Sequence, residues 1–168
     1  MAYTTADAQF LRDKDNKLIL KEFAVYYPDF SESYLSVATF APPYEKQCLP
    51  KHVRRHNSYV THNIHGLEWN DGEYGFHHIT NILWSMTRQF NILYVKGTEK
   101  VKVLQTWMPH LQVLNIEDLG CPNLTKLPLF DSPCENKIHT KFPRFNCASK
   151  NAQRFWLWLC FHTAAANI

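Results

Sequence analysis

Two cysteines and a histidine near the end of the chain have the residue types and the spacing that best suit a metal site. Cys134, His139 and Cys147 are separated by four and by seven residues, and a strongly apolar segment follows them. Thiolate and imidazole groups are common ligands of Zn²⁺, which prefers a tetrahedral set of four such donors. The spacing is looser than in a standard zinc finger, so a fourth ligand must come from elsewhere in the chain.

A structural role is the alternative for these residues. Free cysteine is among the most buried residue types, and Cys147 and Cys160 could both be small core residues. Cys147 also precedes an expected helix, and thiols at helix N-termini ionise readily and become nucleophilic. A nucleophile would need a histidine base within reach, so metal binding explains the same residues with fewer requirements.

The chain is sized for one domain, which we predict over residues 1–168. It has 168 residues, of which 45% are apolar, enough for a single core. No apolar run reaches the roughly 18 residues of a membrane span, and the N-terminus lacks the pattern of a secretory signal. With an odd number of cysteines, five, these features predict a cytoplasmic or nuclear protein with reduced thiols and no membrane association.

The charge argues against a strongly basic nucleic-acid binder. The net charge is +3 with histidine neutral, so any contact with nucleic acid needs a local basic patch. The best local patch is "KHVRRH", which contains Arg54 and Arg55. The alternative is that this run is an ordinary solvated helix face.

The hydrophobic pattern predicts the elements that must position these residues. A β-hairpin is expected where residues 7–11 and 18–27 flank the polar turn "RDKDNK". Strand and helix then alternate, which predicts an α/β domain with an antiparallel hairpin followed by parallel strands and crossover helices. The proline-broken segment 119–143 has no clear element and needs something to hold it. Further strands are predicted at 90–97 and 111–116, and helices at 50–59, 78–90, 98–109, with Thr98 as N-cap, and 148–162.

This order of elements resembles the ribonuclease H-like fold, in the DEDDh branch of the 3′-to-5′ exonucleases. In that family a first strand carries Asp-x-Glu and the second reads roughly "IIEIGAV", and "DAQFLRDKDNKLILKEFAV" has the same layout. The family's "HGI" is similar to "IHGLEW" at residues 64–69. The strand, helix and strand that follow in the family match "NILYVKG", "TEKVKVLQTW" and "QVLNIEDL" in order and approximate length.

The catalytic acids of that family are mostly replaced. Two-metal nucleases hold two cations about 3.5–4 Å apart with converging carboxylates. Asp7 is kept, but Gln9 stands where the glutamate is expected and Lys100 lies near the second aspartate. Where the family has His-x4-Asp at its final helix, this helix opens with Cys147, so no catalytic residue is expected. The alternative of a residual nuclease would use Asp7, Glu22, Glu117 or Asp118.

The replaced positions resemble those of the Maelstrom domain. That domain is similar in fold, but a Glu-Cys-His-Cys set binds zinc in place of the acids. The resemblance implies a closed, structural Zn²⁺ site in which Glu22 joins the three residues above, with Cys121 as a competitor for the place of Glu22. The implied zinc ligands are Glu22, Cys134, His139 and Cys147.

The same resemblance implies a role in RNA silencing. We expect a catalytically degenerate domain that binds single-stranded RNA or a silencing-pathway protein, and no small-molecule substrate. Bases stack on aromatic side chains while basic residues contact phosphates. The alternative is a protein-interaction adaptor anchored by some of the five tryptophans and eight tyrosines. The predicted nucleic-acid-binding residues are Tyr94, Lys96, Lys100, Lys102, Arg54 and Arg55.

Four further histidines lie close together in the sequence. A group of histidines with nearby acids can serve as a general base or bind a metal. The spacing of His62, His65, His77 and His78 fits no ligand pattern, so roles in loops or in the core are favoured.

Overall fold

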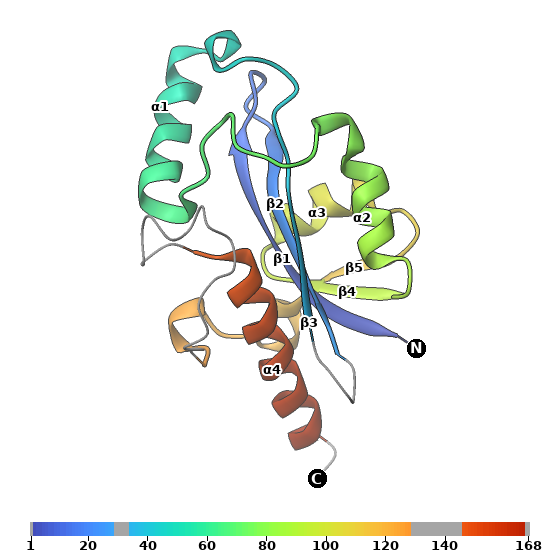
Figure 1. Ribbon diagram of the computed structural model, residues 1–168. Helices are drawn as coiled ribbons and strands as arrows, with labels where there is room; N and C mark the ends of the chain where they lie inside the picture. The colour runs from blue at the N-terminus through green and yellow to red at the C-terminus, as the bar shows by residue number, and fades with distance from the viewer. Residues whose placement is uncertain (1, 29–33, 129–145, 167–168) are drawn as a thin grey trace.

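A computed structural model describes residues 2–28, 34–128 and 146–166 of the chain (Figure 1). A five-stranded sheet forms its centre, and helices lie on both faces and at one end. The strands are β1 (Tyr3–Arg12), β2 (Leu18–Tyr27), β3 (Tyr34–Thr39), β4 (Ile92–Val95) and β5 (Gln112–Asn115).

The sheet is mixed, with the strand order β3-β2-β1-β4-β5. The first three strands are antiparallel neighbours, whereas β4 runs parallel to β1 and β5 runs parallel to β4. This topology confirms the predicted α/β class, with an antiparallel hairpin followed by parallel strands. It is consistent with the arrangement of a ribonuclease H-like fold.

The longer helices cover the sheet unevenly (Figure 1). α2 and α3 contribute apolar side chains to the main core on one face, and α4 packs on β1 and β2 across the other face. α1 closes one end of the hairpin, where Val53 packs with Leu11 and Trp69. The helices are α1 (Lys51–Val60), α2 (Ile79–Thr87), α3 (Thr98–Trp107) and α4 (Ala148–Ala166).

β1 is buried on both sides because helices cover both faces of the sheet. Side chains alternate between the two faces of a strand, so Ala6 and Ala8 enter the main core while Asp7 and Gln9 face the α4 side. All four are buried. The register of β1 with β2 shifts between Gln9 and Phe10, which is a β-bulge at the polar part of the strand.

A buried lysine of β2 holds two segments against the sheet, the chain just after β3 and residues 69–71. The Nζ of Lys21 donates hydrogen bonds to the carbonyl oxygens of Phe40 at 2.8 Å, of Trp69 at 2.7 Å and of Asp71. Burial lowers the pKa of Lys21 to about 8, and the nearby Asp71 carboxylate opposes that shift. Both segments are therefore attached to β2 by the desolvated ammonium group of Lys21.

Two local predictions differ from the structure. Strand β3 was not expected in the proline-containing region after the hairpin, yet Tyr34–Thr39 pairs along β2. The prediction of Thr98 as N-cap of α3 is wrong, because Gly97 takes that position with a φ of 107° and Thr98 is the first helical residue. Glycine adopts this positive φ without steric cost, which lets the chain turn sharply from β4 into the helix.

Within the described residues, none of the helices is both long enough and apolar enough to cross a bilayer.

Candidate functional site

A buried polar cluster lies between the sheet and α4. We call it the Asp7 cluster, formed by Asp7, Gln9, Glu22, Lys100 and Asn151. The Asp7 side chain is 1% exposed, Glu22 is 0% exposed and Asn151 is 2% exposed. Buried carboxylates and amides lose their water and need partners inside the protein. The partners at this site therefore decide what the cluster can do.

Both oxygens of Asp7 are occupied by donors from the protein. The Nζ of Lys100 donates to Oδ1 at 2.6 Å and forms a salt bridge. The side-chain amide of Asn151 donates to Oδ2 at 2.7 Å, and that of Gln9 approaches the same oxygen at 3.4 Å. The carboxylate thus has one ammonium and two side-chain amides around it.

The fold brings Lys100 to Asp7 through the parallel pairing of β4 with β1. Lys100 is the third residue of α3, which starts directly after β4 and the glycine turn. A second ion pair fixes the same end of the helix, because a guanidinium nitrogen of Arg12, at the end of β1, lies 3.0 Å from Oε1 of Glu99. The Nζ of Lys100 is therefore held near the middle of β1, although the lysine side chain keeps 27% of its surface exposed.

The first turn of α4 carries the amide that completes this arrangement. Asn151 donates its backbone N–H to the carbonyl of Cys147 at 3.0 Å, and its side-chain amide also reaches Oδ1 of Asn146 at 2.9 Å. Thr5 on β1 donates to the carbonyl of Ala152 at 2.6 Å. The start of α4 is thus bound directly to the strand that carries Asp7.

Asn151 was not identified from the sequence, although a signal was present. The pair Asn146 and Asn151 has the same spacing as the family's His-x4-Asp, with asparagine at both positions. In the structure it is Asn151 whose side chain reaches Asp7.

Two of the four predicted zinc ligands are described by the structure. Glu22 lies opposite Gln9 in the register of β2 with β1, and it is fully buried. Cys147 is also buried and lies one helical turn before Asn151. A carboxylate and a thiol beside the same cluster are suitable donors for Zn²⁺. Cys134 and His139 lie outside the described residues.

Cys121, the predicted competitor for Glu22, belongs to a different environment. It packs with Ile116, Leu127 and Phe155 in a small apolar cluster under α4. Burial raises the pKa of its thiol, which disfavours the thiolate that a metal would require.

Among the described residues, no three histidine, cysteine, aspartate or glutamate side chains form a group that could hold a metal ion. Asp7, Glu22, Glu117 and Asp118 are all described, so these acids do not converge as a residual two-metal nuclease would require. Glu117 instead pairs with Lys96 at 2.7 Å, and this hydrogen bond holds the pKa of its carboxyl below the usual value.

The six predicted nucleic-acid-binding residues fall into two groups. Lys96 and Lys100 are engaged in the ion pairs with Glu117 and Asp7, and Tyr94 packs edge-on against Tyr3 with ring centres 6.3 Å apart. The other three side chains are exposed and form no ion pair within the described part of the chain. They are Arg54 and Arg55 on α1 and Lys102 on α3.

The histidines near the hairpin end have structural or exposed positions. His65 is buried, accepts the backbone N–H of Leu67 at Nδ1 and so donates from Nε2 to the carbonyl of Phe10, both at 3.0 Å. His77 and His78 are exposed, with ring centres 3.9 Å apart. These positions fit the interpretation that the histidines support loops and the core.

In comparisons with known proteins, the sequence matches no protein-family model and no curated protein.

Proposed function

We propose that this protein is a catalytically inactive ribonuclease H-like domain that binds single-stranded RNA. The observation that carries the first part is the contact of 2.6 Å between Lys100 Nζ and Asp7 Oδ1 inside a buried cluster. The second part is supported by the basic surface of α1, which lies beside the entry of the chain into α4.

The ion pair opposes metal-dependent hydrolysis in two ways. An ammonium beside Asp7 neutralises the carboxylate that would attract a divalent cation, and it occupies the space in which that cation would coordinate. Lysine supplies charge but has no coordination position at which water could be activated. Gln9 and Asn151 then replace carboxylates with amides, which lowers the negative charge of the cluster further.

The basic surface of α1 suits the phosphates of an RNA strand. Val53 and Asn57 face inward, and Asn57 bonds both backbone groups of Arg12 at 2.8 Å, so Arg54 and Arg55 point to solvent. The helix contains no acidic residue, and Tyr59 near its end is 61% exposed. Exposed cations beside an aromatic ring are the features with which proteins bind single strands.

This surface borders the polar side of the sheet. α1 continues into the short π-helical turn η2 (Thr61–His65). The carbonyl of Ile64 in that turn accepts the backbone N–H of Asn146 at 2.7 Å, immediately before α4. A strand that followed the phosphate contacts of α1 would therefore run toward the edge of the Asp7 cluster.

The proposal includes a structural zinc ion held by Glu22, Cys134, His139 and Cys147. When bound, the ion would supply a closed tetrahedral link between the sheet, the start of α4 and the segment before it. From the resemblance to the Maelstrom domain alone, we further propose that the RNA belongs to a small-RNA silencing pathway. Elemental analysis of protein purified without added metal tests the zinc, and we expect one equivalent, lost in Cys147→Ser.

The RNA part is tested by fluorescence anisotropy with a labelled single-stranded RNA at two salt concentrations. We expect binding that weakens as salt rises, because phosphate contacts release counterions. Arg54→Ala with Arg55→Ala should weaken it, whereas Lys126→Ala, an exposed cation on another surface, should not. Binding of a protein partner in place of RNA would favour the adaptor alternative.

The inactive state is tested by restoring the acids. Wild type should not cleave RNA with Mg²⁺ or Mn²⁺ and should show no calorimetric binding of either ion. The triple variant Gln9→Glu, Lys100→Asp, Asn151→Asp should bind Mn²⁺ measurably. Metal-dependent cleavage by wild type that Asp7→Asn abolishes would refute the proposal.

A further inference from the structure

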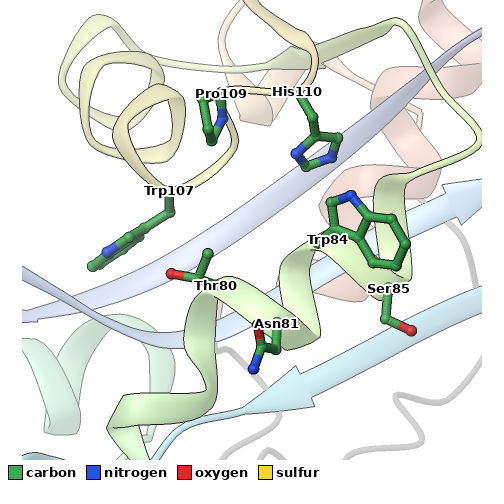
Figure 2. Close-up of a pocket in the computed structure, with 7 residues that line it drawn as sticks. All are labelled: Thr80, Asn81, Trp84, Ser85, Trp107, Pro109 and His110. Carbon is green, nitrogen blue, oxygen red and sulfur yellow. The ribbon is translucent and has the colours of Figure 1, made fainter.

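A pocket lies between α2 and the end of α3, on the side of the sheet away from α4 (Figure 2). Its volume is about 600 Å³, within the range of sites that bind small organic ring systems. Figure 2 shows that its walls come from two segments, the outer side of α2 and the turn that leads from α3 to β5. The lining residues are Thr80, Asn81, Trp84, Ser85, Trp107, Pro109 and His110.

Two indole rings contribute large apolar surfaces to this pocket. Trp84 lies on the solvent side of α2 and is 48% exposed, whereas Leu83 and Met86 of the same helix enter the core. Trp107, the last residue of α3, packs against the core with part of its surface. Exposed tryptophan is a favourable surface for a planar ring, because stacking buries apolar area on both partners.

The polar groups of the pocket are neutral. Thr80, Asn81 and Ser85 add hydroxyl and amide groups that can both donate and accept hydrogen bonds. The Thr87 hydroxyl donates to the carbonyl of Leu83 at 2.6 Å, so it accepts from Nε2 of His110 at 2.9 Å, and Nδ1 of that ring is an acceptor. Partial burial lowers the pKa of His110, which favours the neutral ring. Such a set suits the mixed donors and acceptors of a nucleobase edge.

The surroundings of the pocket favour an anion next to the ring. From residue 74 to residue 116 the sequence contains one acidic residue, Glu99, and Arg12 pairs with it at 3.0 Å. The guanidinium of Arg88 lies over the Trp84 ring, 5.4 Å from its centre. Within that stretch of chain, the only acidic residue is thus Glu99, which is already paired with Arg12.

We propose that this pocket binds an unpaired base of a single-stranded RNA, which stacks on Trp84 while the adjacent phosphodiester contacts Arg88. One guanidinium matches the single charge of a phosphodiester, whereas a free nucleoside triphosphate would need several donors around its phosphates. A proline-rich peptide could stack on the indoles but would leave the cation unused. The ligand class rests on the proposed function, but the pocket residues are separate from α1 and from the Asp7 cluster.

The test compares an RNA oligomer with an abasic oligomer of the same length and charge, by fluorescence anisotropy. Wild type should bind the RNA roughly tenfold more tightly than the abasic strand, because a stacked base contributes about 1–3 kcal/mol. Trp84→Ala should remove this difference and leave abasic binding unchanged. Asn81→Trp, which fills the pocket from an exposed position, should do the same. Phe161→Ala, an exposed aromatic on α4, is the matched control.

The outcomes separate the two proposals. Equal affinity of wild type for both strands, or unchanged RNA binding by Trp84→Ala and Asn81→Trp, overturns the pocket proposal and leaves RNA binding by α1 standing. The pocket is supported if these variants lose the difference in affinity between the RNA and the abasic strand. The α1 surface is refuted if binding is unchanged after removal of the Arg54 and Arg55 side chains. No binding of either strand by wild type overturns both. Trp84-dependent binding of a proline-rich peptide without RNA binding assigns the pocket to a protein ligand.

Discussion

The two faces of the sheet are buried by different chemistry, and β1 belongs to both. Toward α2 and α3 it presents Ala6 and Ala8 to an apolar core, whereas toward α4 it presents Asp7, whose carboxylate is surrounded by Lys100 and Asn151. On the apolar face the groups suited to a ligand lie outside the helices, around Trp84. On the polar face they lie inside, and each bonds another part of the protein.

The difference teaches where binding remains possible in this fold. A buried carboxylate that is already paired with an ammonium gains little from a metal ion, because the ion would first have to displace the lysine. The Trp84 indole, by contrast, is 48% exposed even with the Arg88 guanidinium 5.4 Å from its ring centre, so a ligand can still cover its apolar surface. The Asp7 cluster is thus satisfied by internal partners, while the opposite face offers an open pocket.

The largest expected effect is a loss of packing on the apolar face. Leu83→Ala removes a fully buried side chain from the main core and should lower the free energy of unfolding by about 2–5 kcal/mol. Urea unfolding measures this change. Ile82→Ala, at a partly buried neighbour, should cost clearly less, and equal losses would contradict the placement of this core.

On the polar face, the loss of unfolding free energy at Lys100 should depend on whether Asp7 keeps its charge. Lys100→Met leaves the buried Asp7 carboxylate without its cation and should cost about 2–4 kcal/mol. Adding Asp7→Asn removes the unpaired charge, so the double variant should recover at least about 1 kcal/mol relative to the sum of the single losses. Lys102→Met, on the exposed side of α3, is the control. Additive losses from a double-mutant cycle would show that the pair is not coupled.

Lys21 provides a buried ammonium that forms no salt bridge with a carboxylate in the described part of the chain, and its contribution to stability should depend on pH. Its pKa is about 8 in the folded protein against 10.5 in the unfolded chain. Between these values the unfolded state holds the proton more tightly, so the free energy of unfolding should rise as pH increases from 8 to 10.5, by about 1–3 kcal/mol.

At each pH, the free energy of unfolding of Lys21→Met is subtracted from that of wild type. This subtraction removes other groups that titrate there, among them Tyr27, whose pKa burial raises to about 12. A difference that stays constant from pH 8 to pH 10.5 would show that Lys21 remains protonated, held by its three carbonyls.

The smallest expected change in stability is at the pocket. Trp84→Ala alters an exposed side chain and should change the free energy of unfolding by less than about 0.5 kcal/mol in thermal or urea unfolding. A loss as large as that of Leu83→Ala would mean that Trp84 belongs to the core, and the contrast between the two sides of α2 would fail.

Much of the fold could be predicted because periodic patterns are local. The run "LILKEFAVYY" indicated β2, and the spacing of Ile79, Leu83 and Met86 indicated α2 from their own neighbourhoods. Strand β3 was missed because Ala38 is its only buried residue. Its strand conformation comes instead from backbone pairing with β2 at the edge of the sheet. An edge strand with so few buried residues has no clear hydrophobic alternation in its sequence.

The candidate site was predicted in part. Gln9 and Lys100 were singled out from the sequence together with Asp7, and both residues do lie in the cluster of Asp7. Asn151 was missed because its contact with Asp7 spans 144 positions of sequence. The aromatic pocket gave no signal either, since Trp84 and Trp107 belong to separate helices that only packing brings together.

By itself the sequence determined the α/β class, the hairpin, and the alternation of strands and helices. It could not decide whether Lys100 is a surface charge or the counterion of a buried carboxylate. The tertiary structure decided that, because the parallel pairing of β4 with β1 brings two side chains 93 positions apart to 2.6 Å. Side-chain periodicity depends on neighbours along the chain, whereas the role of a charge depends on which groups surround it after folding.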